Sequence, residues 1–136
     1  MALLFVWNDS YKTGIEIVDS QHRKLVDLIN ELYTQMGKGQ GNQALSKILD
    51  ELVTYTVTHF TAEERLLEKA GYPDLPAHRK VHEDFTNRVK QMQRDVASGK
   101  FVMSVSLATF LKEWLSGHIL GTDKKYVPHL TAKGIK

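Results

Sequence analysis

The sequence contains no cysteine among its 136 residues. Disulfide bonds and thiolate metal sites are therefore excluded, and because cysteine-free chains suit a reducing compartment, we expect a cytoplasmic protein. A hydrophobic run of about 18 residues, which a membrane-spanning helix needs, is also lacking. The apolar opening MALLFVW has no positive flank and meets Asn8 and Asp9 too soon for a signal peptide. We expect no membrane segment.

Charge of one sign is not in excess either. The chain has 18 lysines and arginines against 16 aspartates and glutamates, and the positive residues are scattered apart from Lys124, Lys125 and the tail. Without a basic face, neither a nucleic acid nor an anionic membrane is an expected partner. We expect a small ligand and a monomeric protein.

The alternation of apolar and polar residues that marks a strand is absent, and no segment repeats. With 42% hydrophobic residues, the chain is long enough for one sizeable core and too short for two domains. Glycine and proline separate an irregular arm, about residues 1–18, from four helical segments ending by about residue 128, with a short tail beyond. Asp19 or Ser20 is the expected cap of the first segment, and Pro128 marks the latest end of the fourth. The segments are predicted at 19–36, 42–70, 77–99 and about 104–127.

Short connections between long helices favour antiparallel neighbours, so the predicted fold is all-α, an antiparallel up-down-up-down four-helix bundle with an irregular N-terminal arm. Each predicted helix carries an apolar stripe at steps of three and four residues. The stripes begin or end at Leu25, Tyr55, Phe85 and Trp114. By themselves they indicate only a bundle.

Every stripe continues into histidine at one end. In an antiparallel bundle the start of the first helix, the end of the second, the start of the third and the end of the fourth lie at the same end of the molecule. The residues at these places are predicted to meet in one layer of the core. They are His22, His59, Glu63, His78, His82 and His118.

One such motif is weak evidence. HRKVH at 78–82, or HFTAE at 59–63, would more often be a solvated helix face, and a lone histidine on an apolar stripe is more often a hydrogen-bonded core residue than a ligand. Their convergence changes the interpretation. Each unpaired buried polar group costs on the order of 1–3 kcal/mol, and an unpaired carboxylate several, against a total stability of about 5–15 kcal/mol. The pattern therefore predicts a cation among them.

Asp123 is a further candidate ligand. It follows His118 by five residues, about 140° around an ideal helix, so the two side chains share a centre only if the helix is loosened or bulged there. Gly121 favours such a distortion. A carboxylate near a helix C-terminus meets the unfavourable end of the helix dipole and so needs its own reason to be there.

Donor type and number narrow the metal. Imidazole nitrogens and carboxylate oxygens suit iron, zinc, copper or manganese, and seven such residues are too many for one ion. If two six-coordinate ions are assumed, five histidines, two bridging carboxylates and a solvent-derived bridge leave one position open. The last two helices supply three histidines to one ion, whereas the first two supply only His22 and His59 to the other. The open position is therefore predicted beside these two histidines.

The ordered set His22, HFTAE, HRKVH and HILGTD resembles the di-iron ligand signature of the hemerythrin family. The arm WNDSYKTGIEIVDSQH is similar to the N-terminal region of single-domain bacterial members, so the resemblance covers nearly the whole chain. It implies two iron ions per chain, bridged by Glu63, Asp123 and an oxo or hydroxo group. It also implies that dioxygen binds reversibly at the iron held by His22 and His59.

The same resemblance implies a dry pocket for oxygen. Five hydrophobic residues lie within one helical turn of the expected ligands: Leu25, Phe60, Trp114, Leu115 and Ile119. Leu115 is the strongest candidate for a contact with bound oxygen. Tyr126, three residues after Asp123, is expected to donate a hydrogen bond to a bridging carboxylate, and His129, beyond Pro128, is assigned to the surface.

The expected function is oxygen storage, transport or delivery to an oxygen-consuming enzyme. Two alternatives stay open: a di-iron oxidoreductase of the peroxidase, nitric oxide reductase or oxidase type, and an oxygen or redox sensor. The Glu-x-x-His pairs of ferritin-like oxidases do not occur, which counts against the first alternative. A chain of 136 residues leaves no room for a fused signalling domain, which counts against the second.

Overall fold

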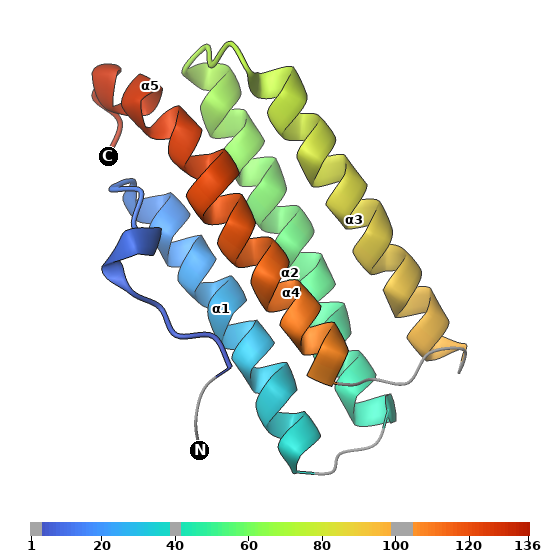
Figure 1. Cartoon of the computed structure of the whole chain (residues 1–136). Coiled ribbons are helices and arrows are strands. Elements are labelled where there is room, and N and C mark those ends of the chain that lie inside the picture. The colour runs from blue at the N-terminus through green and yellow to red at the C-terminus, as the bar shows by residue number, and fades with distance from the viewer. Residues whose placement is uncertain (1–3, 39–41, 99–104) are drawn as a thin grey trace.

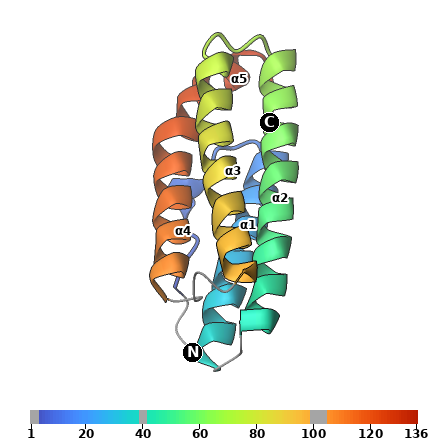
Figure 2. The same cartoon turned by 90° about the vertical axis from the view of Figure 1, so that its right-hand side faces the viewer.

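Four long helices form an antiparallel bundle (Figures 1 and 2). The computed structural model describes residues 4–38, 42–98 and 105–136. The bundle helices are α1 (Glu16–Gly37), α2 (Asn42–Lys69), α3 (Leu75–Ala97) and α4 (Val105–Gly117), and they alternate in direction along one axis. Helix α1 lies beside α2 and α4, and α2 lies beside α3. The all-α, up-down-up-down prediction is confirmed.

The segment predicted as one helix at about 104–127 is divided in the structure, and helical turns continue past Pro128, its latest expected end. After α4 the chain continues through a π-helical turn η2 (His118–Thr122), a 3-10 turn η3 (Asp123–Tyr126) and a short helix α5 (Val127–Ala132). Pro128 occupies the first turn of α5, where the missing N–H has no helical partner to lose. The loosening expected around Gly121 is present as the π-helical turn.

Two helices also begin earlier than predicted. Helix α1 starts at Glu16, and Asp19 does not cap it. The Asp19 carboxylate instead accepts hydrogen bonds from the Thr13 N–H and hydroxyl, both at 2.8 Å, and from the Gly14 N–H at 3.2 Å. Its acceptors are therefore used to hold the end of the arm. Helix α3 starts at Leu75 because Pro at the second helical position is pre-set for a first turn.

The turn between α2 and α3 closes through a left-handed glycine. Gly71 has φ +67°, and the Tyr72 N–H bonds the Leu67 carbonyl at 3.0 Å, which satisfies an orphan carbonyl at the end of α2. This tight closure keeps the end of α2 beside the start of α3. The metal-binding candidates of both helices lie near this turn.

The arm packs along α1 and α4. Phe5 is buried, and Asn30 of α1 bonds it twice: the Phe5 N–H donates to Asn30 Oδ1 at 2.9 Å, and Asn30 Nδ2 donates to the Phe5 carbonyl at 2.7 Å. Farther along the arm, the Tyr11 and Ser116 hydroxyls lie 3.1 Å apart. Asn30 is therefore the buried polar side chain that fixes the start of the arm against the bundle.

Among the residues whose burial is described, the apolar core consists of two clusters. The larger fills the middle of the bundle and includes Leu32, Leu49, Phe85 and Leu111. The smaller lies at the end where α5 returns over the bundle and consists of Ile15, Val18, Leu67, Ala70, Tyr72, Leu75, Tyr126 and Leu130. The histidines and carboxylates that are expected to bind metal belong to neither cluster, although they are buried.

Asn30→Ala is expected to weaken the attachment of the arm. It leaves the buried Phe5 N–H and carbonyl without their partner, which costs roughly 1–3 kcal/mol. Urea unfolding should show this loss, and limited proteolysis should cut the arm faster. Asn87→Ala, at an exposed position of α3, is the control and should change stability by no more than about 0.5 kcal/mol. Equal urea midpoints for the two variants would show that Asn30 does not hold the arm.

Candidate metal centre

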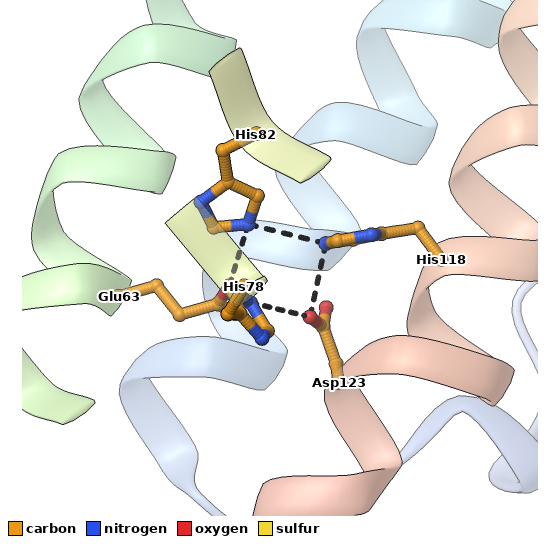
Figure 3. Close-up of side chains that lie close together, drawn as sticks. All are labelled: Glu63, His78, His82, His118 and Asp123. Carbon is orange, nitrogen blue, oxygen red and sulfur yellow. Dashed lines mark hydrogen bonds and ion pairs between the residues drawn. The ribbon is translucent and has the colours of Figure 1, made fainter. Parts of the chain in front are cut away.

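Seven polar side chains meet inside one end of the bundle, five of which appear in Figure 3. None is more than 4% exposed. They are His22 of α1, His59 and Glu63 of α2, His78 and His82 of α3, His118 of η2 and Asp123 of η3. All seven residues expected from the sequence to be metal ligands are thus brought together.

Helical spacing explains how each element presents its donors. His59 and Glu63 are one turn apart on α2, as are His78 and His82 on α3, so each pair shares a face. His118 and Asp123 depend on the π-helical turn: the Asp123 N–H bonds the His118 carbonyl, an i→i+5 bond that brings residues five apart onto the same side. Without this turn, the Asp123 carboxylate would point away from His118.

The donor atoms form two groups. Within each group, all donor atoms lie within 4.8 Å of one another. Both groups contain Glu63 and Asp123. The first adds three histidines, His78, His82 and His118, and the second adds two, His22 and His59. We call these the three-histidine group and the two-histidine group. This division matches the one expected from the order of the helices.

Each shared carboxylate directs one oxygen to each group. Glu63 Oε1 lies 2.8 Å from His78 Nε2 and 3.1 Å from His82 Nε2, whereas Glu63 Oε2 lies 3.6 Å from His59 Nε2. Asp123 Oδ1 lies 3.0 Å from His118 Nε2, whereas Asp123 Oδ2 lies 3.0 Å from His22 Nε2. With one oxygen in each group, both carboxylates would be able to bridge a pair of ions.

Several of these atoms have no hydrogen-bond partner. His22 Nε2, His59 Nε2 and both oxygens of Asp123 are buried and make no hydrogen bond with any residue that the structure describes. Although His22 Nε2 and Asp123 Oδ2 are close, they are not aligned as donor and acceptor. Buried polar atoms are almost always satisfied, so a set of unsatisfied atoms with metal-ligand chemistry fits bound cations.

The carboxylates carry negative charge into the core. Burial and the neighbouring Asp123 act to raise the pKa of Glu63, but hydrogen bonds from His78 and His82 outweigh them and lower it to about 2. Burial acts in the same direction on Asp123, yet attraction to His118 holds its pKa well below the usual value. Two ionised carboxylates in a nonpolar interior require positive charge nearby.

Two of the histidines differ in their proton affinity. Burial lowers the pKa of His59 to about 4, so at neutral pH its ring is an uncharged donor. For His78, burial is outweighed by its contacts with Asp123 and Glu63, and its pKa rises to about 9. A metal ion bound there competes with this proton, since only the neutral ring is a ligand.

Tyr126 touches the centre directly. Its hydroxyl donates to Glu63 Oε2 at 2.9 Å, and the residue is fully buried. Burial and the nearby carboxylates Glu63 and Asp123 hold its pKa well above the usual value, so the hydroxyl keeps its proton. The tyrosine therefore acts as a hydrogen-bond donor that orients one carboxylate oxygen.

Aromatic rings cover two of the histidines. Phe60 stacks on His82 with ring centroids 3.7 Å apart, and Trp114 stacks on His118 at 4.5 Å, both nearly parallel. Phe60 and Trp114 were expected in an oxygen pocket beside the two-histidine group. Their ring faces also lie on ligand candidates of the three-histidine group.

A small apolar cavity lies next to the centre. Its wall includes Leu25, Phe60, Trp114 and Leu115, four of the five residues expected to form the oxygen pocket. Ile119 is buried but does not contribute to this wall. Thr56 is the polar residue in the lining, and its hydroxyl is occupied by the Leu52 carbonyl at 2.7 Å.

Two residues that touch the centre from outside were not expected from the sequence. Gln21 Oε1 lies 2.7 Å from His59 Nδ1, and Glu64 Oε2 lies 2.8 Å from His82 Nδ1. Each directly adjoins an expected ligand in the sequence, but its partner is on a neighbouring helix. The assignment of His129 to the surface was wrong: it is partly buried, and its Nε2 bonds the Ala70 carbonyl at 2.8 Å.

Comparison with protein families decides the interpretation of this centre. Residues 13–130 match the model of the hemerythrin HHE cation-binding domain. The chain belongs to the hemerythrin family. The resemblance found in the ligand motifs is therefore confirmed. At the level of the family, the chain is an oxygen-binding protein with a di-iron centre.

Individual hemerythrins are similar over most of their length. A bacteriohemerythrin of Stenotrophomonas maltophilia is 40% identical over 132 residues, which cover 97% of this chain and 84% of that protein. A myohemerythrin of Riftia pachyptila is 32% identical over 93% of both chains. A solved structure of wild-type hemerythrin superposes with a TM-score of 0.89 at 30% identity and covers 94% of this chain and 98% of that one. Across the described ranges, no helix of this hemerythrin has the length and hydropathy to cross a bilayer.

Metal removal should destabilise the bundle. A cation held at 100 times its dissociation constant stabilises the folded state by about 2.7 kcal/mol, which for a domain of this size corresponds to roughly 10 °C. Calorimetry before and after treatment with a chelator, with metal content measured in both samples, should show this fall and its reversal on addition of ferrous iron. An unchanged unfolding temperature in metal-free protein would mean that the seven side chains need no cation.

Proposed function

We propose that this hemerythrin binds dioxygen reversibly at two iron ions held by His22, His59, Glu63, His78, His82, His118 and Asp123. The observation that carries the proposal is the division of each carboxylate between the two donor groups: one oxygen of Glu63 and one of Asp123 lie with each set of histidines. When bound, two ferrous ions supply the two electrons that dioxygen takes up and returns. Storage, transport or delivery to an oxygen-consuming enzyme in the cytoplasm, by a monomer, completes the proposal.

The protein residues have three tasks in this function. The histidines and carboxylates hold the ions, and Tyr126 fixes Glu63 by donating to Oε2. Phe60 and Trp114 fix two imidazole rings by stacking on them. The apolar wall that includes Leu25 and Leu115 excludes water, which protects a reversible site from proton-assisted release of reduced oxygen.

The unequal number of donors in the two groups supports an oxygen site on one particular side of the centre. The two-histidine group has four protein donors, whereas the three-histidine group has five. Leu25, one turn beyond His22 on α1, extends the cavity wall toward the group with fewer donors, while Phe60 and Trp114 connect the same wall to the other group. We place the open position beside His22 and His59.

Oxygen binding without turnover is favoured over the oxidoreductase alternatives by the cavity lining. An oxidase or peroxidase needs a proton donor or acceptor within reach of the reacting oxygen. Among the lining residues Thr56 is the polar one, and its hydroxyl is already bonded to the backbone. Among the described residues, the lining therefore offers no acid or base to drive catalysis.

The function is tested by anaerobic loading with ferrous iron followed by optical spectra through repeated addition and removal of oxygen. We expect two irons per chain and a spectral change that reverses over several cycles. Irreversible oxidation in the first cycle would favour a sensor or enzyme, and turnover with peroxide or nitric oxide would favour catalysis. One iron per chain would contradict the proposed centre.

Leu115→Ala should separate the pocket from the core. The smaller side chain admits water beside the site, so autoxidation should become at least several-fold faster while both irons remain bound. Truncation of a buried leucine also costs roughly 2–5 kcal/mol, so a loss of stability is expected in either case.

Leu32→Ala is the matched control for this variant. Leu32 is fully buried in the larger core cluster and does not contribute to the cavity wall. It should lose comparable stability with little effect on autoxidation. If the two variants autoxidise at the same rate at matched stability, Leu115 is ordinary core packing.

A further inference from the structure

The two donor groups differ in the residues that support them from outside. His82 of the three-histidine group points its Nδ1 at the carboxylate of Glu64, at 2.8 Å. His59 of the two-histidine group points its Nδ1 at the side-chain amide oxygen of Gln21, at 2.7 Å. In both cases Nε2 faces the centre, so the ring donates its Nδ1 proton outward when Nε2 is a ligand. One acceptor is charged and the other is neutral.

Glu64 is itself held in place. Its Oε1 lies 3.3 Å from Arg79 Nε, which leaves Oε2 for His82. Arg79 also contacts Glu68, with 3.0 Å between Arg79 Nη2 and Glu68 Oε2. The Glu64 side chain is 24% exposed, whereas those of Arg79 and Glu68 are 47% and 68% exposed. The carboxylate therefore lies between the buried histidine and a surface ion pair, where it cannot turn freely.

We propose that Glu64 is a positioning residue for His82 and that, with Gln21 as its neutral counterpart on His59, it makes the three-histidine group the tighter metal position, so that the two ions bind in order. The inference rests on the proposed function in one respect, that both groups hold a metal ion.

The physical reason is the effect of a carboxylate on a ligand imidazole. A carboxylate that accepts the Nδ1 proton fixes the tautomer and the ring orientation, and it makes Nε2 a stronger donor. An amide oxygen fixes the same tautomer but adds no negative charge. Loss of such an outer contact typically weakens metal binding by about 10–100-fold.

A purely surface role for Glu64 makes a different prediction. If Glu64 served only to pair with Arg79, its removal would cost about 0–1 kcal/mol of stability and leave metal binding unchanged. Metal affinity therefore separates the two roles.

Cobalt(II) is a suitable probe because its visible spectrum reports the donors around each ion and because it can be followed without oxygen. Titration of metal-free protein with cobalt(II) alone should show two binding steps with distinct spectra. In Glu64→Ala the first step should weaken by about 10–100-fold, and the two steps should move closer together. Glu64→Gln, which keeps an acceptor for the His82 proton but removes the charge, should recover part of this loss.

Two further variants complete the set. Glu68→Gln removes the second carboxylate partner of Arg79. Because Glu68 contacts no histidine among the described residues, this change should leave both cobalt-binding steps unchanged. Gln21→Glu places a carboxylate on His59 and should tighten the second step. A first step within twofold of wild type in Glu64→Ala, or equal weakening of both steps, would overturn the proposal.

The outcomes also distinguish this inference from the proposed function. If wild-type protein binds fewer than two cobalt ions, the two-metal centre itself is wrong. If it binds two ions in one step and Glu64→Ala behaves the same way, only the ordered loading is wrong.

Discussion

The rest of the structure depends on the burial of two carboxylates and five imidazoles in one layer of a helical core. Removing a carboxylate from water costs several kcal/mol even after the protein relaxes, so this layer is tolerable only when cations or protons balance it. The low pKa of Glu63 keeps that carboxylate ionised at neutral pH, so the balancing positive charge lies on protonated histidine or on bound cations. The layer is therefore organised around positive charge, and apolar clusters lie on either side of it.

In the C-terminal segment, the regular helix is interrupted at the residues that are expected to bind metal. A regular helix after α4 would have turned Asp123 away from His118, and the wider π-helical turn corrects this. The 3-10 turn and α5 then return the chain over the end of the bundle. They bury Tyr126 against Glu63 and Leu130 in the smaller core cluster. The segment that follows α4 thus supplies both the carboxylate of Asp123 and the hydroxyl that donates a hydrogen bond to Glu63.

The centre is unequal on its two sides, and the inequality has a structural basis. Rings stack on His82 and His118, and a charged acceptor supports His82, all in the three-histidine group. The two-histidine group has fewer donors and a neutral outer contact. One metal position has rigid ligands with a charged outer acceptor, and the other has fewer protein donors in apolar surroundings. This combination suits a ligand that binds and leaves without further reaction.

The sequence by itself determined the helices, the faces they bury and the residues placed in one layer, because a period of 3.6 residues records which side of a helix each histidine occupies. It also indicated the distortion before Asp123, since two residues five positions apart, such as His118 and Asp123, do not share a face of a regular helix. The contacts of Gln21, Glu64 and His129 were decided by the tertiary structure alone. Each depends on the rotation and axial shift of one helix against another, which no periodicity along a single helix contains. The start of α1 at Glu16 and the continuation of the chain past Pro128 into α5 were decided in the same way, because Asp19 bonds the arm and Leu130 of α5 packs in the smaller core cluster.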